Sequence, residues 1–447
     1  MFDRWLAGKW RVVLASLALL VALSSLAASP AWAIQIDITK EGGLQALPIA
    51  LPDFVSLDPG GAPGLPGEMG RKLVELVTAD LEGSGLFRAV PRAGHLQDPV
   101  SLWKGASYKD WRLVGAEAVV SGAVREAGGK LVVDFYLHNV YRGTLWGKGK
   151  RFTSSPADWR FVAHRVADEI YTRVTGEGPY FASRVAFIAE KGKRKWLSLM
   201  DQDGANRLDL QVGSAIALTP RFSPDGGRLF YVSFETGEPR IFRWDLYEGR
   251  KFQQGDYPGL NSTPAWSPDG RRMAVTLSKD GNAEIYIKDL FSQGLTRLTQ
   301  NSAIDTSPTW SPDGRQIAFT SDRGGGPQIY VMGADGQNVR RITYEGKNNT
   351  APAWSPSGDK VAFVMGGGGR FRIAVTDPEG AAVRVLTDSW MDESPTWSPN
   401  GRVLIFSRQE GSHTRLYTID HTGHNERLVP VGDGIEASDP SWSPLIR

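Results

Sequence analysis

Few side chains in this sequence are suited to catalysis or to metal binding. The chain has no cysteine, which excludes disulfides and thiolate chemistry, and none of its six histidines lies at a metal-binding spacing from another. It contains no Gly-x-Ser-x-Gly segment, the usual setting of a hydrolase nucleophile. His413, His421 and His424 fall within one stretch, on expected loops or outer strands. We therefore expect no catalytic residues and no bound metal or cofactor.

Small hydroxyl-bearing and acidic residues recur just before a repeated proline, and they are suited to hydrogen-bonding a partner. The alternative is that they make only local turn hydrogen bonds. We expect them on loops that enter the innermost strands of a repeated unit. The candidate binding residues are Thr219, Thr263, Asp305, Thr306, Ser307, Asn349, Thr350, Glu393, Ser394 and Asp439.

The repeat itself reads Pro, any residue, aromatic, Ser, Pro, and it occurs six times. The aromatics are separated by 44, 44, 44, 43 and 45 residues. A period of this length with four short strands per unit is typical of a β-propeller with one blade per repeat. The repeated aromatics are expected to pack between neighbouring blades, because a large ring fills the gap between twisted sheets. They are Phe222, Trp266, Trp310, Trp354, Trp397 and Trp442.

The unit is clearest between Ser307 and Thr343, where Pro-Asp-Gly and Ala-Asp-Gly turns separate runs of strand-forming residues. The ends of the repeat region supply three strands after Ser183 and a single strand around Trp442. Together these complete one blade, so the ring closes and leaves no open edge. The four strands expected in the clearest unit are Pro308–Ser311, Gln316–Ser321, Gln328–Met332 and Val339–Thr343.

The first 33 residues have the pattern of a secretory signal peptide. A basic start is followed by the apolar stretch Val12–Ala28 and by Ala31-Trp32-Ala33, which predicts cleavage between Ala33 and Ile34. An uncleaved membrane anchor is the alternative, since 17 apolar residues are at the lower limit for spanning. Without residues 1–33 the chain carries 48 basic and 48 acidic residues. A net charge of zero argues against nucleic acid or anionic lipid as the main partner.

Residues 34–175 differ in character from the repeats and predict an α/β domain. Buried strands are expected at Pro48–Leu51 and Ala118–Gly122, and another strand at Lys130–Val140. Apolar residues at helical spacing predict helices over Glu68–Leu81 and Asp158–Val174. Residues 176–182, with Gly-Glu-Gly-Pro, are expected to form a linker to a propeller over residues 183–447.

The predicted mature N-terminus alternates apolar and polar residues. Such a segment could add as an edge strand to a partner's sheet, or it could be an ordinary first strand of the α/β domain. Gly42 and Gly43 follow it and could serve as a hinge. The segment comprises Ile34, Gln35, Ile36, Asp37, Ile38 and Thr39.

The chain resembles the TolB family, which is the soluble periplasmic component of the Tol-Pal system of Gram-negative envelopes. The resemblance rests on the signal pattern, on Ser84–Arg88, on Thr175–Ala189 and on the Ser-Pro-Asp-Gly turns, in the family's domain order. It implies a small α/β domain before a six-bladed all-β propeller. It also implies two protein partners: the lipoprotein Pal at the mouth of the propeller channel, and TolA at segment Ile34–Thr39.

Two other functional classes, a hydrolase-accessory propeller and a carbohydrate-binding propeller, fit the sequence less well. A hydrolase-accessory propeller requires a following catalytic domain, and the sequence ends soon after the sixth repeat. A carbohydrate-binding propeller requires aromatic rings exposed on the channel face, whereas the repeated tryptophans are expected at packing positions. We therefore expect a non-enzymatic protein-binding scaffold for outer-membrane integrity and for constriction during cell division.

Overall fold

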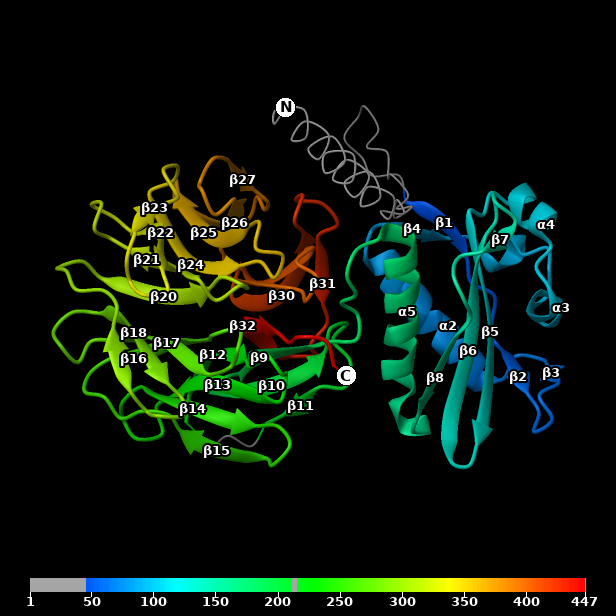
Figure 1. Ribbon diagram of the computed structural model, residues 1–447, viewed down its shortest axis with the longest axis horizontal. Coiled ribbons are helices and arrows are strands. Elements are labelled where there is room, and N and C mark those ends of the chain that lie inside the picture. The colour runs from blue at the N-terminus through cyan, green and yellow to red at the C-terminus, as the bar shows by residue number, and fades with distance from the viewer. Residues whose placement is uncertain (1–45, 211–214, 447) are drawn as a thin grey trace, which may run out of the picture.

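The computed structural model describes residues 46–210 and 215–446, in which a small α/β region precedes a ring of six four-stranded sheets (Figure 1). The predicted signal peptide, its cleavage site and segment Ile34–Thr39 lie outside the described residues. Within the described part of the chain, no helix is both long enough and apolar enough to cross a membrane. The predicted fold class, an α/β region followed by a six-bladed propeller, is confirmed.

The α/β region is built on a mixed sheet around the long strand β5. β1 and β2 pair with β5 in parallel, whereas β6 pairs with it along its whole length in antiparallel. β4 extends the sheet beyond β1, and β7 and β8 pair with β6. The strands are β1 (Leu47–Ala50), β2 (Val55–Leu57), β3 (Pro63–Gly64), β4 (Phe87–Ala89), β5 (Ala118–Ala127), β6 (Lys130–Asn139), β7 (Thr144–Leu145) and β8 (Lys150–Ser154).

Helices cover both faces of this sheet. α2 (Glu68–Gly83) and α5 (Trp159–Thr175) pack on the face turned toward the propeller, and α3 (Pro99–Lys104) and α4 (Tyr108–Leu113) lie on the other (Figure 1). Residues of β5 alternate between the two cores, because successive side chains of a strand point to opposite faces. Val120 packs with α2 and α5, and Val119 packs with Trp111 of α4.

Each blade is an antiparallel sheet whose strands follow one another in the sequence. The strands, from the channel outward, are β12 (Ala217–Phe222), β13 (Arg228–Ser233), β14 (Arg240–Asp245) and β15 (Arg250–Gln253); β16 (Asn261–Trp266), β17 (Arg272–Leu277), β18 (Glu284–Asp289) and β19 (Leu295–Arg297); β20 (Asp305–Trp310), β21 (Gln316–Ser321), β22 (Gln328–Gly333) and β23 (Arg340–Arg341); β24 (Asn348–Trp354), β25 (Val361–Gly367), β26 (Arg370–Thr376) and β27 (Val383–Val385); β28 (Asp392–Trp397), β29 (Val403–Glu410), β30 (His413–Asp420) and β31 (Arg427–Val429).

The sixth blade joins the two ends of the propeller, as the sequence predicted. β32 (Glu436–Trp442) pairs with β9 (Arg184–Lys191), followed outward by β10 (Arg194–Asp201) and β11 (Leu208–Asp209). Trp442 is buried, and its indole N–H donates to Ser183 Oγ at 2.8 Å. The C-terminal strand thereby closes the ring and removes the edge that β9 would otherwise expose.

The α/β region and the propeller share one buried core. Residues of α2 and α5 pack in the same cluster as Trp442 and Val429 of the propeller. The expected linker is part of this core, since Tyr180, Phe181 and Ala182 are all buried. The linking segment is thus a packed connection between the two parts.

Candidate functional site

A left-handed residue precedes the repeated proline in every blade. These residues have φ between 46° and 54°, and each interrupts the pairing of the innermost strand with its neighbour. Proline offers no N–H to the ladder, so the strand bulges at this pair of residues. Positive φ is strained for a β-branched residue, so Thr219 and Thr263 indicate a conformation imposed by the ring. The six residues are Thr219, Thr263, Ser307, Ala351, Ser394 and Asp439.

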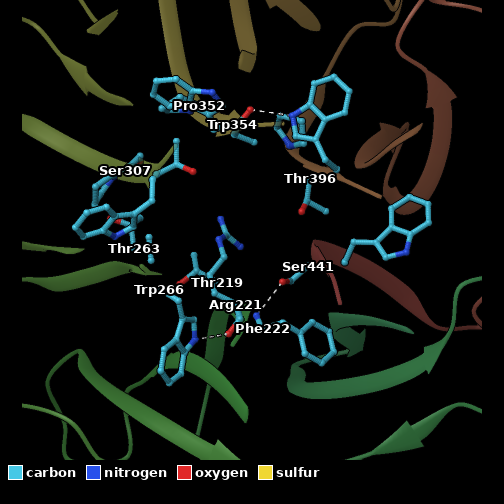
Figure 2. Close-up of a pocket in the computed structure, with 18 of the residues that line it drawn as sticks. Thr219, Arg221, Phe222, Thr263, Trp266, Ser307, Pro352, Trp354, Thr396 and Ser441 are labelled. Atoms are coloured by element: carbon cyan, nitrogen blue, oxygen red, sulfur yellow. Dashed lines mark hydrogen bonds between the residues drawn. The ribbon is translucent and has the colours of Figure 1, made fainter. Parts of the chain in front are cut away.

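The six bulges line the central channel of the propeller. The channel encloses about 460 Å³, and all six left-handed residues contribute to its wall (Figure 2). Between each repeated proline and its aromatic, one further side chain lines the channel. These six residues are Arg221, Ala265, Thr309, Ala353, Thr396 and Ser441. The wall therefore carries hydroxyl groups from several blades, which are suited to hydrogen-bonding a ligand or partner loop.

Five of the ten predicted binding residues line this channel: Thr219, Thr263, Ser307, Ser394 and Asp439. Thr306, Thr350 and Glu393 lie one residue before a bulge, and Glu393 is exposed to solvent. The expectation that these residues lie on loops was wrong for the innermost strands, which begin before the bulge. β20 starts at Asp305, three residues earlier than predicted.

Asp305 and Asn349 are fully buried, and they bond to the wall of the propeller, Asp305 within its own blade and Asn349 to the preceding blade. The Asp305 carboxylate accepts hydrogen bonds from Arg323 and from Asn301, each at 2.9 Å. The Asn349 amide donates to Gln328 Oε1 at 2.8 Å. The same position in β28 holds Asp392, which pairs with Arg408. These hydrogen bonds fasten the start of the inner strand to neighbouring strands, so the three side chains have a structural role.

Seven of these twelve channel residues were not among the predicted candidates: Ala351 and the six residues that follow the prolines. Ala351 is the left-handed residue of its blade, and aligning the six prolines would have found it because it occupies the same register as Thr263. Arg221 lies on the C-terminal side of its proline, outside the segment that sequence reasoning considered. It is the one cation, and Asp439 the one acid, among the described residues that line the channel.

Charges at the channel mouth perturb one another. Burial lowers the pKa of Arg221, and nearby Asp439 acts in the opposite direction. Loss of some surrounding water and repulsion by Asp439 raise the pKa of the Glu393 carboxyl, although the residue as a whole is exposed. Asp439 Oδ1 accepts a hydrogen bond from Ser394 Oγ at 2.7 Å, which joins two neighbouring blades. The mouth therefore combines hydroxyl groups with an acidic pair and one deeper cation.

The repeated tryptophans pack between blades, as predicted. Trp266 of β16 stacks on Phe230 of the preceding blade with ring centroids 3.8 Å apart. Its indole N–H donates to the carbonyl of Arg221, and Trp397 donates likewise to the carbonyl of Ala353. Such ring-to-blade contacts fix the neighbouring inner strands and so shape the channel wall.

Among the described residues, the group whose atoms could surround a metal ion is His164, Asp201 and Asp203, none of which lines the channel. Arg160 already pairs with both carboxylates. His413 is exposed, whereas His421 and His424 lie in the hairpin between β30 and β31. These positions bring no histidine into the channel wall as the structure describes it.

Two family models match the chain, "TolB amino-terminal domain" over residues 34–146 and "TolB beta propeller domain" over residues 171–446. The Tol-Pal system protein TolB of Paramagnetospirillum magneticum is 44% identical over 253 residues, 55% of each chain. The corresponding protein of Cereibacter sphaeroides (strain ATCC 17029 / ATH 2.4.9) is 42% identical over 235 residues, 52% of each chain. The chain thus spans about half the length of the curated relatives it matches.

A solved structure gives a broader match. The crystal structure of TolB from Acinetobacter baumannii is 30% identical to this chain, with a TM-score of 0.78. The match covers 90% of this chain and 97% of the other. It therefore extends over both the α/β region and the propeller.

Proposed function

Because the chain belongs to the TolB family, we propose that it is a non-enzymatic scaffold that connects two proteins of the Tol-Pal system. The propeller holds the lipoprotein Pal at the mouth of its channel, and segment Ile34–Thr39 binds TolA. The chain works in the periplasm after cleavage between Ala33 and Ile34. Its role is to support outer-membrane integrity and constriction during cell division.

The observation that carries this proposal is the ring of six left-handed residues around the channel. Each blade contributes a residue from the same register to one concave surface. A rigid scaffold that gathers polar groups from many strands is the usual setting of a binding site. Strained backbone at the same six positions supports a functional use, since such strain concentrates at binding sites.

The side chains around the channel favour binding over catalysis. The described wall offers hydroxyl groups, Arg221 and Asp439, and these lack the base and nucleophile pairing that acyl or glycosyl transfer uses. Trp310, Trp354, Trp397 and Trp442 are only 5–9% exposed, and half-buried Trp266 is covered on one ring face by Phe230, so these rings offer little open face to the channel. The wall offers hydrogen-bonding groups, which suit a protein loop. A sugar would instead need an exposed aromatic ring of the protein on which to stack.

The Pal site is tested by placing arginine at the channel mouth. Thr306→Arg and Glu393→Arg lie on different blades and introduce bulk and charge where a partner loop must enter. Steric or like-charge conflict at an interface costs several kcal/mol, so each variant should bind Pal at least tenfold more weakly in calorimetric titration.

The matched control is Glu379→Arg. Glu379 is an exposed residue in the hairpin between β26 and β27, and antiparallel connectivity puts that hairpin at the opposite end of the blade from Glu393. It should leave Pal affinity unchanged. The melting temperatures of all three variants should stay close to that of the parent protein, because surface changes usually cost less than about 0.5 kcal/mol. Unaltered Pal affinity in both mouth variants would remove the site from this face.

The TolA site is tested by deleting Ile34–Thr39. Strand addition relies on main-chain hydrogen bonds from the added segment, so the deletion should abolish TolA capture in a pull-down. Pal binding and the melting temperature should stay as they are in the full mature chain. Loss of both partners together would show instead that the segment is a structural strand.

A further inference from the structure

Arg221 stands out in the channel because, among the residues that the structure describes, no carboxylate of the wall forms an ion pair with it. Figure 2 shows its side chain reaching into the space between the blades. Among the described residues, its one hydrogen bond goes from Nη1 to the carbonyl oxygen of Pro220 at 2.7 Å. A guanidinium has five N–H donors, so most of them face the channel. The side chain is half-buried at the channel wall, where a charge with reduced access to water is normally paired.

Packing of the propeller does not require an arginine at this position. The same register in the other five blades holds small side chains, namely Ala265, Thr309, Ala353, Thr396 and Ser441. Arg221 is thus a departure of one blade from its own repeat. We therefore look for the role of Arg221 in the binding of a ligand that enters the channel.

The neighbouring acid does not satisfy this cation. Asp439 is near enough to influence Arg221, but its carboxylate accepts from Ser394 Oγ. Among the described residues no ion pair within 4.0 Å joins Asp439 to Arg221. Several donors of the guanidinium therefore stay available to a ligand.

We propose that Arg221 makes the channel a binding site for a single carboxylate group. A planar guanidinium binds a carboxylate through two parallel N–H···O bonds. Hydroxyls of Thr219, Thr263 and Ser307 line the same space and can donate further hydrogen bonds. One positive charge beside Asp439 matches a monoanion better than a phosphate dianion.

The carboxylate group that binds Arg221 can come from either of two ligands. It can belong to a small free acid, for which a channel of about 460 Å³ has room, or to an acidic side chain on a partner loop that enters the mouth. The second source rests on the proposed binding of Pal. The experiment therefore has one arm without Pal and one arm with it.

The first arm measures ¹³C-acetate binding to the mature protein by line broadening at constant ionic strength. The parent protein should broaden the signal, and Arg221→Met should reduce the broadening at least tenfold. Arg221→Lys should retain part of it, because it keeps the charge and loses the two-pronged geometry. The control Arg250→Met, on the exposed strand β15, should behave as the parent. Equal broadening by the parent and Arg221→Met would overturn the proposal.

The second arm measures Pal affinity of the same variants by calorimetry, with and without acetate. If Pal supplies the carboxylate, Arg221→Met should weaken Pal binding at least tenfold, and acetate should compete in the parent but not in the variant. Unchanged Pal affinity beside a positive acetate arm assigns the site to a free acid. If Pal does not bind the parent at all, the proposed function fails while the acetate arm still decides the site.

Discussion

The carboxylate of Asp168 holds the segment that joins the α/β region to the propeller. Its Oδ1 accepts from the backbone N–H groups of Tyr180 and Phe181 at 2.8 and 2.7 Å, and its Oδ2 accepts from Ala182 at 2.9 Å. Burial raises the pKa of Asp168 to about 6, against the opposing effect of these three donors. One side chain on α5 thereby fixes the path of three consecutive residues.

Asp168→Asn should destabilise the protein, because its NH₂ group would face the N–H of Ala182 without an acceptor. An unsatisfied buried polar group costs about 1–3 kcal/mol, which chemical denaturation at pH 7 would measure. The conservative change Glu82→Gln, at an exposed residue of α2, serves as the control for loss of a carboxylate. Equal stability of Asp168→Asn and the parent would contradict this role.

The same residue predicts a pH dependence. Since its pKa is higher in the folded protein than the ordinary value of 3.8, the folded state keeps a proton that the unfolded chain releases. Its contribution to the free energy of unfolding is full below pH about 4 and falls by up to about 1.4 kcal/mol per pH unit toward pH 6. The stability advantage of the parent over Asp168→Asn should therefore shrink from pH 4 to pH 6. An advantage that grew over this range would contradict the raised pKa.

At the scale of elements, β32 carries the closure of the ring. It pairs with β9, and Trp442 on it is buried beside Tyr180, with ring centroids 6.2 Å apart. The strand therefore supports the sixth blade and the interface with the α/β region together.

Trp442→Ala should lower the free energy of unfolding by about 3–5 kcal/mol, the usual cost of removing a buried tryptophan. Deleting residues 438–447 should cost more, because it also exposes the edge of β9. Trp442→Phe keeps a ring in the core and should lose less than the alanine variant. Urea denaturation measures all three. An unchanged unfolding midpoint after the deletion would refute closure by this strand.

Regular elements were predictable from the sequence because their side chains follow a simple period. The predicted strand Gln316–Ser321 agrees with β21 residue for residue, and the predicted helices over Glu68–Leu81 and Asp158–Val174 agree with α2 and α5 within two residues. The start of β20 was missed because a left-handed residue before proline interrupts the alternation of side chains. Propensity alone does not predict that a strand continues through such a bulge.

The sequence predicted which segments of the blades form the candidate site, but it did not predict which side chains of those segments line the channel. Hydroxyl and acidic residues before the prolines indicated the channel, but sequence alone could not separate Ser307, which lines it, from Asp305, which is buried against Arg323. That difference depends on which way each side chain points at the bulge. Arg221 was missed because its position follows the proline, where the other blades carry small residues.

At the scale of the whole molecule, the two parts are joined by several contacts besides the linking segment. Gln202 of the propeller donates to Asp80 of α2 at 2.9 Å, and Asn425 donates to the carbonyl of Gly83 at 2.8 Å. The Asp80 carboxylate also bonds His164 of α5 at 2.7 Å. These contacts join the propeller directly to α2 and, through Asp80, to α5.

The most direct measurement of the central claim is photo-crosslinking of the mature protein to Pal. A photo-reactive residue is introduced at Glu393, at the channel mouth, or at Glu379, at the opposite end of the propeller, and purified Pal is added before irradiation. If Pal binds at the channel mouth, a covalent Pal adduct should form from position 393 and none from position 379. An adduct from position 379 with none from position 393 would contradict it.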